Sequence, residues 1–245
     1  MNDSAALTAA FRAFSRNEAA TELDGALLVN QVLDPTVDVE AVRRHLNDLA
    51  PPAGVPVWEH LSALGFRGDD QTYQDLANSQ LACVLERRKG IPITLAVVLL
   101  QLARARGEPA FGLNTPGHFL SRIGEYVVDP FSMSVLEMSG EMEPAGPVDV
   151  ALRMLNNVKQ IFSGAGRQSE ALDIVDYQLA MMSVPGMRAM LLLEKAELWR
   201  TLGVADLAVE TFEAARAAAP EDAQLGKVCE ARIAQLKRSG PMTRH

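Results

Sequence analysis

Residues 84–130 constrain the fold of this chain more than any other stretch. A basic turn, Glu-Arg-Arg-Lys-Gly-Ile-Pro, ends one helical pattern, and an apolar helical pattern follows it directly. Short segments of strand type come next, and they carry His118 and Asp129. This order predicts an α+β fold that is mostly helical and contains one small antiparallel sheet.

The composition is that of an ordinary globular protein. With 245 residues, 48% of them hydrophobic, the chain is long enough for one large domain or two small ones with a sizeable core. Its formal net charge of -8 weighs against nucleic acid and anionic membranes as partners, because binding to either depends on clustered Lys and Arg. We therefore expect no nucleic-acid partner and no membrane partner.

The cysteines indicate neither a disulfide nor a metal site. Cys83 and Cys229 lie far apart in helical patterns, without a Cys-x-x-Cys pair or a nearby group of histidines. We expect reduced thiols, no metal and no cofactor.

The N-terminal residues do not have the pattern of a signal peptide. Arg12, Arg16 and Glu18 interrupt the Ala-rich stretch before it can become an apolar core. The longest strongly apolar run, residues 95–100, is too short to cross a bilayer. We therefore expect a cytoplasmic protein.

Apolar residues recur at helical spacing in the part of the chain before residue 107. Asp38 is a suitable N-cap. Gly90 is expected to take the left-handed conformation that closes one helix, and Pro92 suits the first turn of the next. The predicted helices are residues 5–14, 23–33, 39–49, 57–64, 73–88 and 93–106.

A strand pattern replaces the helical one after Gly107. Pro116-Gly117 and Gly124 are turn signals between short segments that alternate or carry β-favouring residues. Residues 137–147, rich in Glu, Gly, Pro and Met, read as a linker. The predicted strands are residues 110–113, 118–122 and 125–128.

The last third of the chain is helical and repeats itself. Small, aromatic and turn residues between 191 and 220 fall at the positions of a tetratricopeptide helix pair, where small side chains let two helices approach closely. Residues 155–183 are a looser copy, and residues 221–237 are a capping helix. We therefore predict two domains, residues 1–147 and residues 148–245.

Several short sequence motifs are shared with a known family. They are Leu-Gly-Phe-Arg-Gly at 64–68, Asn-Ser at 78–79, Val-Leu-Glu-Arg-Arg-Lys-Gly-Ile-Pro-Ile at 84–93, Pro-Gly-His-Phe-Leu at 116–120 and Asp-Pro-Phe at 129–131. With these motifs, the chain from about residue 23 to residue 220 is similar to the bacterial SirB-type proteins, which join a transglutaminase-like domain to tetratricopeptide-like helices. The resemblance implies a papain/transglutaminase-like core followed by a tetratricopeptide-like helical domain, and it implies little about activity.

The resemblance also implies where a nucleophile would lie. Active transglutaminase-like enzymes place a Cys at the start of the core helix and then a His and an Asp on adjacent strands. His118 and Asp129 match the last two, but counting back from Gly107 places Pro92 at the cysteine position. Proline has no attacking atom and no N–H for an oxyanion, and losing one such donor typically costs about a hundredfold in rate.

Two other residues are weighed as nucleophiles. Cys83 lies in a helix before the basic turn and is interpreted as a core or half-buried thiol. Thr94 lies nearer the helix start and could be deprotonated by His118, but a hydroxyl in a first turn more often makes a local hydrogen bond.

The basic turn has two interpretations. Arg87, Arg88 and Lys89 can interact favourably with the C-terminal dipole of their own helix. Alternatively, one arginine pairs with a buried carboxylate, or the cluster receives an anionic group or an acidic peptide. The candidate binding residues are Arg87, Arg88, Thr94 and Asn114.

Two functional hypotheses remain. The preferred one is a noncatalytic pseudoenzyme that binds a protein or peptide partner, in which His118 and Asp129 are vestigial or bind a ligand. The alternative is a cysteine-protease-like hydrolase or acyl transferase that uses the same pair with an atypical nucleophile.

Overall fold

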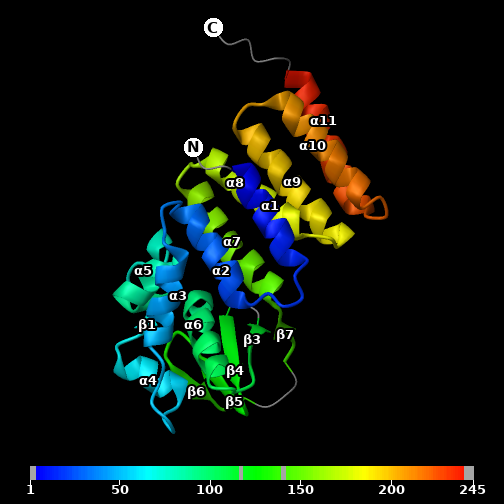
Figure 1. Cartoon of the computed structure of the whole chain (residues 1–245). Coiled ribbons are helices and arrows are strands. Elements are labelled where there is room, and N and C mark those ends of the chain that lie inside the picture. The colour runs from blue at the N-terminus through cyan, green and yellow to red at the C-terminus, as the bar shows by residue number, and fades with distance from the viewer. Residues whose placement is uncertain (1–3, 116–117, 139–141, 240–245) are drawn as a thin grey trace. The chain divides into compact units, whose positions relative to one another are not determined.

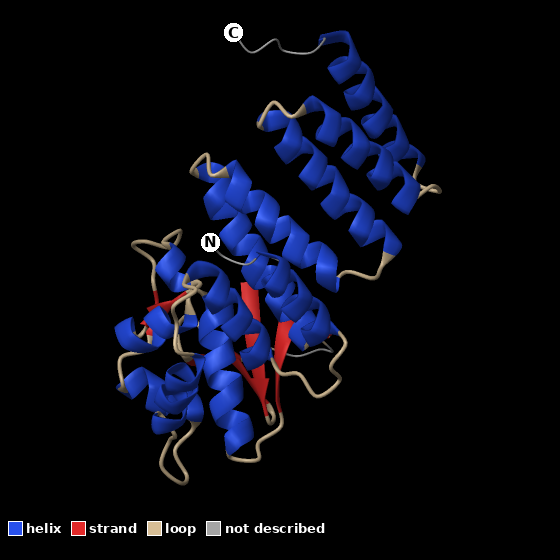
Figure 2. Cartoon of the chain, turned by 45° about the horizontal axis from the view of Figure 1, so that its top comes forward, coloured by secondary structure: helices blue, strands red, loops and turns tan. Residues whose placement is uncertain are grey.

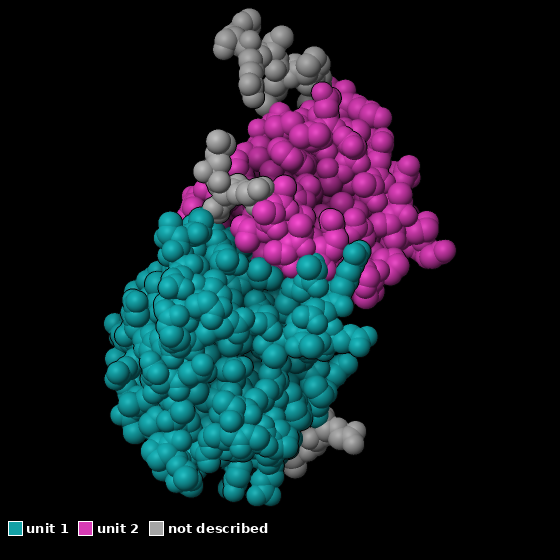
Figure 3. All heavy atoms as spheres, viewed as in Figure 1, with its two compact units in different colours: residues 1–3, 13–158 teal, residues 4–12, 159–245 magenta. Residues whose placement is uncertain are grey.

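The computed structural model describes residues 4–115, 118–138 and 142–239 (Figure 1). These residues are mostly helical, with a small antiparallel sheet (Figure 2), so the predicted fold class is confirmed. Two compact units are present (Figure 3): residues 13–158 lie in the first, and residues 4–12 together with the chain from residue 159 onward lie in the second. The predicted boundary at residue 147 coincides with the start of α7 (Pro147–Gly164), and the compact units divide within that helix.

The first unit begins with helices whose ends are set by polar side chains. Thr21 and Asp24 form a reciprocal capping box at the start of α2, and Asp38 caps α3 as predicted, accepting from the Ala41 N–H at 3.0 Å. Most of the helices predicted before residue 107 are confirmed within one or two residues, including α1, of which residues 4–12 belong to the second unit. They are α1 (Ser4–Ser15), α2 (Glu22–Leu33), α3 (Val39–Asp48), α4 (Val57–Ala63) and α6 (Pro92–Ala105).

The single helix predicted over residues 73–88 is wrong. The structure has a short 3-10 helix, η1 (Leu76–Asn78), and a separate helix α5 (Leu81–Arg87). The Asp75 side chain accepts from the Ala77 N–H at 3.0 Å, and the Asn78 amide donates to the Thr72 carbonyl at 2.7 Å. These local bonds compete with a continuous helix, because they use the backbone groups that a helix would pair.

The prediction that Gly90 closes the helix is also wrong. Arg88 takes the left-handed conformation, with φ 56° and ψ 31°. Gly90 lies instead in β2 (Lys89–Gly90), which pairs in parallel with β1 (Arg67–Gly68). A Cβ at Gly90 would lie 3.0 Å from Cγ2 of Val84, so a larger residue here fits only if the Val84 side chain shifts by a few tenths of an ångström.

Helix α6 is the centre of the first unit. Pro92 occupies its first position, as predicted, and nearly the whole helix is buried. Its residues contact α2 as well as strands β3 (Ala110–Thr115) and β4 (His118–Ile123) of the sheet (Figure 1). This nearly all-apolar helix therefore acts as the core element on which the sheet packs.

The sheet is antiparallel, in the order β6-β5-β4-β3-β7 among the described residues. The three predicted strands are confirmed, and β6 was not predicted. Part of the linker predicted over residues 137–147 is wrong, because β7 pairs with β3 there; residues 139–141 and the predicted turn at Pro116-Gly117 lie outside the described residues. The strands are β3 (Ala110–Thr115), β4 (His118–Ile123), β5 (Tyr126–Asp129), β6 (Ser134–Leu136) and β7 (Pro144–Ala145).

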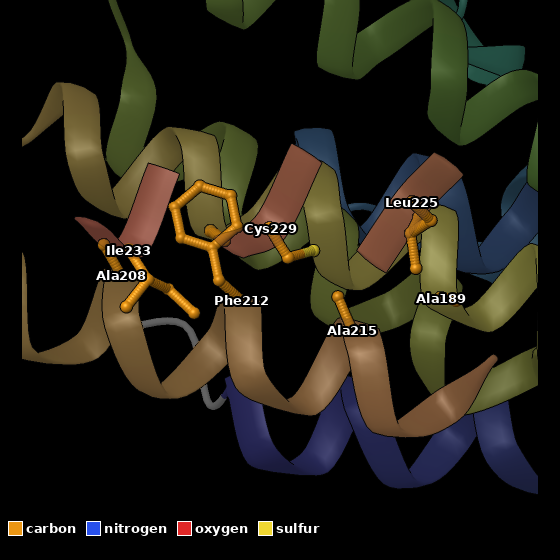
Figure 4. Close-up of a cluster of buried hydrophobic side chains, with 8 residues drawn as sticks. Ala189, Ala208, Phe212, Ala215, Leu225, Cys229 and Ile233 are labelled. Atoms are coloured by element: carbon orange, nitrogen blue, oxygen red, sulfur yellow. The ribbon is translucent and has the colours of Figure 1, made fainter. Parts of the chain in front are cut away.

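The second unit is built from helices. Phe11 of α1 stacks on Tyr177 of α8, with ring centroids 5.2 Å apart. Figure 4 shows a second core in which Phe212 of α10 and Cys229 of α11 are fully buried. Its helices are α8 (Gln168–Met181), α9 (Pro185–Thr201), α10 (Ala205–Ala218) and α11 (Ala223–Ser239), with the end of α7 and residues 4–12 of α1.

In the part of the chain that the structure describes, no helix combines the length and the apolar character needed to cross a membrane.

Candidate functional site

His118 and Asp129 meet at one end of the sheet. His118 is the first residue of β4 and Asp129 is the last residue of the antiparallel neighbour β5. The imidazole Nε2 lies 3.0 Å from Oδ1 of the carboxylate. The His118 side chain is 44% exposed and that of Asp129 is 15% exposed, so the pair is accessible from the imidazole side.

Further hydrogen bonds hold the Asp129 carboxylate in place. Its Oδ1 also accepts from the Phe131 N–H at 2.8 Å, and its Oδ2 accepts from the Ser132 hydroxyl at 2.9 Å. The two hydroxyl oxygens of Ser132 and Ser134 are 2.7 Å apart. A carboxylate fixed in this way can orient an imidazole, and it leaves Nδ1 of His118 as the nitrogen that a nucleophile would have to approach.

A chain of contacts links Asp129 to the start of α6. The Gly68 N–H donates to the Phe131 carbonyl at 2.7 Å, and the Phe131 ring fills the space beside Gly68. Gly68 pairs with Gly90 between β1 and β2, and Pro92 follows Gly90 after one residue. The acid–imidazole pair and the first turn of α6 therefore belong to one continuous set of packed elements.

The first turn of α6 contains no hydrogen-bonded nucleophile. Pro92 is buried, and no side chain caps the helix at Ile91. Thr94 is fully buried, and its hydroxyl has no hydrogen-bond partner among the residues that the structure describes. The Thr115 hydroxyl donates at 2.6 Å to the backbone carbonyl of His118, and not to its ring.

Cys83 is not arranged as an attacking thiolate. Its sulfur lies 3.2 Å from Oε1 of Gln80, the N-cap residue of the same helix. Burial raises the pKa of the Cys83 thiol, and the nearby Glu86 carboxylate adds to the effect. The thiol form is therefore favoured at neutral pH, whereas nucleophilic attack requires the thiolate.

Arg87 contacts a buried carboxylate, as one interpretation of the basic turn anticipates. Its Nη2 lies 3.2 Å from Oδ2 of Asp69, and its Nη1 lies 3.5 Å from Oδ2 of Asp75. The Thr72 hydroxyl and N–H bond the Asp69 carboxylate, which lowers the pKa of Asp69 to about 2. Arg88 donates to the Leu64 carbonyl at 2.7 Å. Both arginines thus tie the basic turn to the segment before η1.

Asn114 is held by a residue that the sequence analysis did not identify. Arg153 of α7 donates from Nη1 to Oδ1 of Asn114, and its guanidinium lies 5.4 Å from the centroid of the Phe119 ring. Asn114 and Phe119 are cross-strand partners, one residue pair away from His118. Arg153 therefore braces the strand ends beside the imidazole.

A groove of about 470 Å³ lies within the second unit. This groove was not predicted, and its one local signal in the sequence is Lys159 in an otherwise apolar helix face. The Lys159 ammonium donates to Oε1 of Gln178 at 3.0 Å and to the Glu194 carboxylate. The groove is lined by Lys159, Gln160 and Ser163 of α7 and by Leu193, Glu194, Glu197, Leu198 and Thr201 of α9.

Within the described ranges, the structure contains no group of three or more His, Cys, Asp and Glu side chains placed to hold a metal ion.

Comparison with known proteins places this site in a recognised domain. Residues 39–143 match the model of the transglutaminase-like superfamily. A UPF0162 protein of Xylella fastidiosa is 31% identical, in a match that covers 49% of this chain and 52% of the relative. A UPF0162 protein of Pseudomonas aeruginosa is 30% identical, over 46% of this chain and 49% of the relative. Human F-box only protein 21 is 41% identical over 24% of this chain and 9% of the relative.

The chain spans about half the length of the UPF0162 proteins that it matches first. No solved structure gives a significant match. Residues 39–143, which include Pro92, His118 and Asp129, therefore form a transglutaminase-like domain, and its UPF0162 homologues are about 30% identical.

Proposed function

We propose that this chain is a noncatalytic transglutaminase-like protein, a cytoplasmic pseudoenzyme that binds a protein or peptide partner. The observation that carries the proposal is Pro92 at the first position of α6, where the sequence resemblance places the nucleophilic cysteine. Proline supplies neither an attacking atom nor an N–H for an oxyanion. His118 and Asp129 then have no nucleophile to activate, and the pair serves to hold a ligand or the ends of two strands.

The helices of the second unit supply the binding surface in this proposal. Small residues are buried where α9 and α10 pack, as in a tetratricopeptide-like pair, and the SirB-type resemblance covers the same helices. The groove between α7 and α9 has a volume within the usual range of ligand-binding clefts, and it is lined by both apolar and charged groups. A groove of this kind suits a helical or extended segment of a partner protein.

Capture of partners from a cell lysate tests the proposal. Ser163→Trp fills the groove, whereas Ala214→Trp adds the same side chain at an exposed position of α10 outside it. We expect immobilised full-length chain and the Ala214→Trp variant to capture the same proteins, and Ser163→Trp to lose them while remaining folded. His118→Ala should retain them. Equal capture by Ser163→Trp, or no captured protein under any condition, contradicts the proposal.

A hydrolase or acyl transferase is the second candidate, because His118 and Asp129 are hydrogen bonded as a base and its orienting acid would be. Thr94 and Cys83 are the residues to test as nucleophiles. A panel of amide and ester substrates, with thiol- and hydroxyl-directed active-site probes, separates the two candidates. Activity that is abolished by His118→Ala in a folded protein favours the enzyme, and labelling that is unchanged by this substitution argues against it.

A further inference from the structure

Two cations are neighbours across the short parallel ladder of the first unit. Arg67 of β1 is the register partner of Lys89 of β2. Neighbouring strands lie about 4.8 Å apart, and register partners project to the same side, so the two side chains begin next to each other. Like charges directly opposite each other destabilise a sheet. An anion bound between these side chains would therefore relieve a repulsion that the ladder itself creates.

Arg88 brings a third cation to the same place. Its Nη1 donates to the Leu64 carbonyl at 2.7 Å, and Nη1 of Arg67 donates to the Gly65 carbonyl at 3.4 Å. Leu64 and Gly65 are consecutive, with Cα atoms about 3.8 Å apart, so both guanidiniums are held at the C-terminal end of α4. The dipole of a helix offers only about half an elementary charge there, which does not neutralise two cations. Together with Lys89, these two arginines form the basic cluster.

Carboxylates do not neutralise the basic cluster. Among the residues that the structure describes, none of its three cations forms an ion pair, whereas Arg87 of the same turn is paired with Asp69 and Asp75. The other acids nearest in sequence are Asp70 and Glu86, which are exposed and also form no ion pair within the described ranges. The charge of the cluster is therefore open to an anion from outside the chain.

The two guanidiniums of the cluster also have hydrogen-bond donors to spare. Each carries five N–H groups and binds the protein through Nη1 alone. Nε and Nη2, the edge that can hold two oxygens side by side, make no hydrogen bond in the described part of either arginine's surroundings. Arg67 and Arg88 are both exposed, so an oxyanion can reach them from solvent.

We infer that the basic cluster binds a phosphate monoester group. At pH 7 such a group carries close to two negative charges and three terminal oxygens, so it can accept from both guanidiniums and from Lys89 at once. A carboxylate has one charge and two oxygens and satisfies less of the cluster. The formal net charge of -8 does not prevent this binding, because charges further away than about 8 Å are largely screened at physiological ionic strength.

Other anionic partners fit the cluster less well. Nucleic acids and anionic membranes are bound through many phosphates, often about 6–10 for a DNA-binding protein, and the cluster offers three cations. The phosphate monoester itself has two sources, a small phosphorylated molecule or a phosphorylated residue of a partner protein. Both present the same chemistry to the cluster, and the experiment below separates them. The inference does not depend on the groove of the second unit.

Titration of the full-length chain with phenyl phosphate at low ionic strength tests the inference. Binding is followed by the NMR shifts of the backbone amides. We expect saturable shifts in residues 64–68 and 86–90, and weaker binding of phenyl sulfate, of the diester methyl phenyl phosphate and of benzoate, which each carry a single negative charge. Ser163→Trp should bind phenyl phosphate like the parent chain, because Ser163 lines the groove and not the cluster.

Variants of the two arginines show whether the cluster is the site. Arg88→Gly removes one guanidinium at a position whose backbone suits glycine, and Arg67→Gln removes the other at an exposed position. Each should weaken the binding of phenyl phosphate about fivefold. Arg67→Lys should weaken it less than Arg67→Gln, because it keeps the charge but loses the paired donors. Lys227→Gln, at an exposed cation of α11, removes the same charge in the second unit and should have no effect.

A degenerate library of phosphoserine peptides identifies the source of the phosphate. Peptides that bind more tightly than phenyl phosphate, and that are weakened by Arg88→Gly, assign the phosphate to a partner protein. Peptides that bind no more tightly assign it to a small phosphorylated molecule. Either result supports a phosphate monoester site.

Several results would overturn the inference. They are the absence of saturable shifts, shifts that Arg67→Gln and Arg88→Gly leave unchanged, and binding of the singly charged probes as tight as that of phenyl phosphate. Equal binding of library peptides that carry Glu in place of phosphoserine would assign the cluster to an acidic segment instead. An oligonucleotide that binds the cluster more tightly than phenyl phosphate does would assign it to a nucleic acid.

Discussion

Arg104 of α6 makes a bidentate interaction with the Glu22 carboxylate of α2 through both terminal nitrogens of its guanidinium. Nη2 lies 2.8 Å from Oε1, and Nη1 contacts Oε2. The remaining nitrogen, Nε, donates to the Ala110 carbonyl of β3 at 2.9 Å. Bonding to Glu22 raises the pKa of Arg104. One side chain thus connects the core helix, a second helix and the sheet of the first unit.

Removing Arg104 should destabilise the first unit strongly. Glu22 is 2% exposed, so Arg104→Met leaves a buried carboxylate without its cation. The expected loss is about 3–5 kcal/mol in the free energy of unfolding, measured by chemical denaturation at pH 7. Glu22→Leu combined with Arg104→Met removes both charges and should cost less than Arg104→Met alone. If the double variant lost as much free energy of unfolding as Glu22→Leu and Arg104→Met lose together, the two residues would not interact.

The Asp69 carboxylate should make the stability of the protein depend on acid pH. Its pKa is lowered to about 2 in the folded chain, mainly by hydrogen bonds from Thr72, against a usual value of 3.8. A carboxyl with a depressed folded pKa stabilises the fold above its unfolded pKa and loses this contribution as the pH falls through the folded value. We therefore expect part of the free energy of unfolding to disappear between about pH 4 and pH 2.

The pH dependence of the free energy of unfolding of Asp69→Asn tests this expectation. The variant should be less stable than the parent chain at pH 7, and its free energy of unfolding should fall less steeply between pH 4 and pH 2. Asp70→Asn, at the exposed neighbour, is the control and should follow the parent curve. Parallel curves for Asp69→Asn and the parent would mean that another group produces the acid dependence.

Structural features that depend on neighbouring residues could be predicted from the sequence. Asp38 caps α3 and Pro92 begins α6 because both act through their own backbone or the next turn. Gly124, which predicted a turn between two strands, lies between β4 and β5 with a φ of 57°. The fold class could be predicted from these signals together with the change of period after Gly107.

Structural features that depend on contacts between residues far apart in the chain could not be predicted from local sequence patterns. Arg88 takes the left-handed conformation because β2 must pair with β1 immediately afterwards, and no local pattern reveals that pairing. Arg153 meets Asn114 across 39 residues of sequence. The Lys159–Glu194 contact at the groove spans 35 residues. Local periodicity carries no information about such contacts, whereas the pairing of His118 with Asp129 was anticipated from the family resemblance.

At position 88, glycine should stabilise the fold more than alanine does, which is the reverse of their order inside a helix. Its φ of 56° is a conformation that costs a residue with a Cβ about 1 kcal/mol or more, and glycine avoids that cost. Both Arg88→Gly and Arg88→Ala lose the hydrogen bond to the Leu64 carbonyl, so their difference isolates the backbone effect. We expect Arg88→Gly to be more stable than Arg88→Ala by about 1 kcal/mol in chemical denaturation.

Glu86, exposed and inside α5, is the control for this comparison. At a helical position glycine is less favourable than alanine by about 1 kcal/mol, so Glu86→Gly should be the less stable of its two variants. The same order at both positions would contradict a left-handed Arg88.

Gly68→Ala should disturb the loop that supports Asp129. A Cβ at Gly68 would lie 2.2 Å from two ring atoms of Phe131, so the ring has to move away from β1. Overpacking of this kind typically costs about 1–3 kcal/mol, and here it displaces the residue whose N–H bonds the Asp129 carboxylate. We expect a lower free energy of unfolding together with a shifted NMR signal of the His118 ring. Gly164→Ala, with no neighbouring atom within 4 Å of the added Cβ, should cause neither change.

Adding Phe131→Ala to Gly68→Ala removes the clash, so the double variant should lose less stability than the two single losses combined. Simple additivity would show that the Phe131 ring does not pack on Gly68, and that the contact chain from Asp129 to α6 is broken at this point.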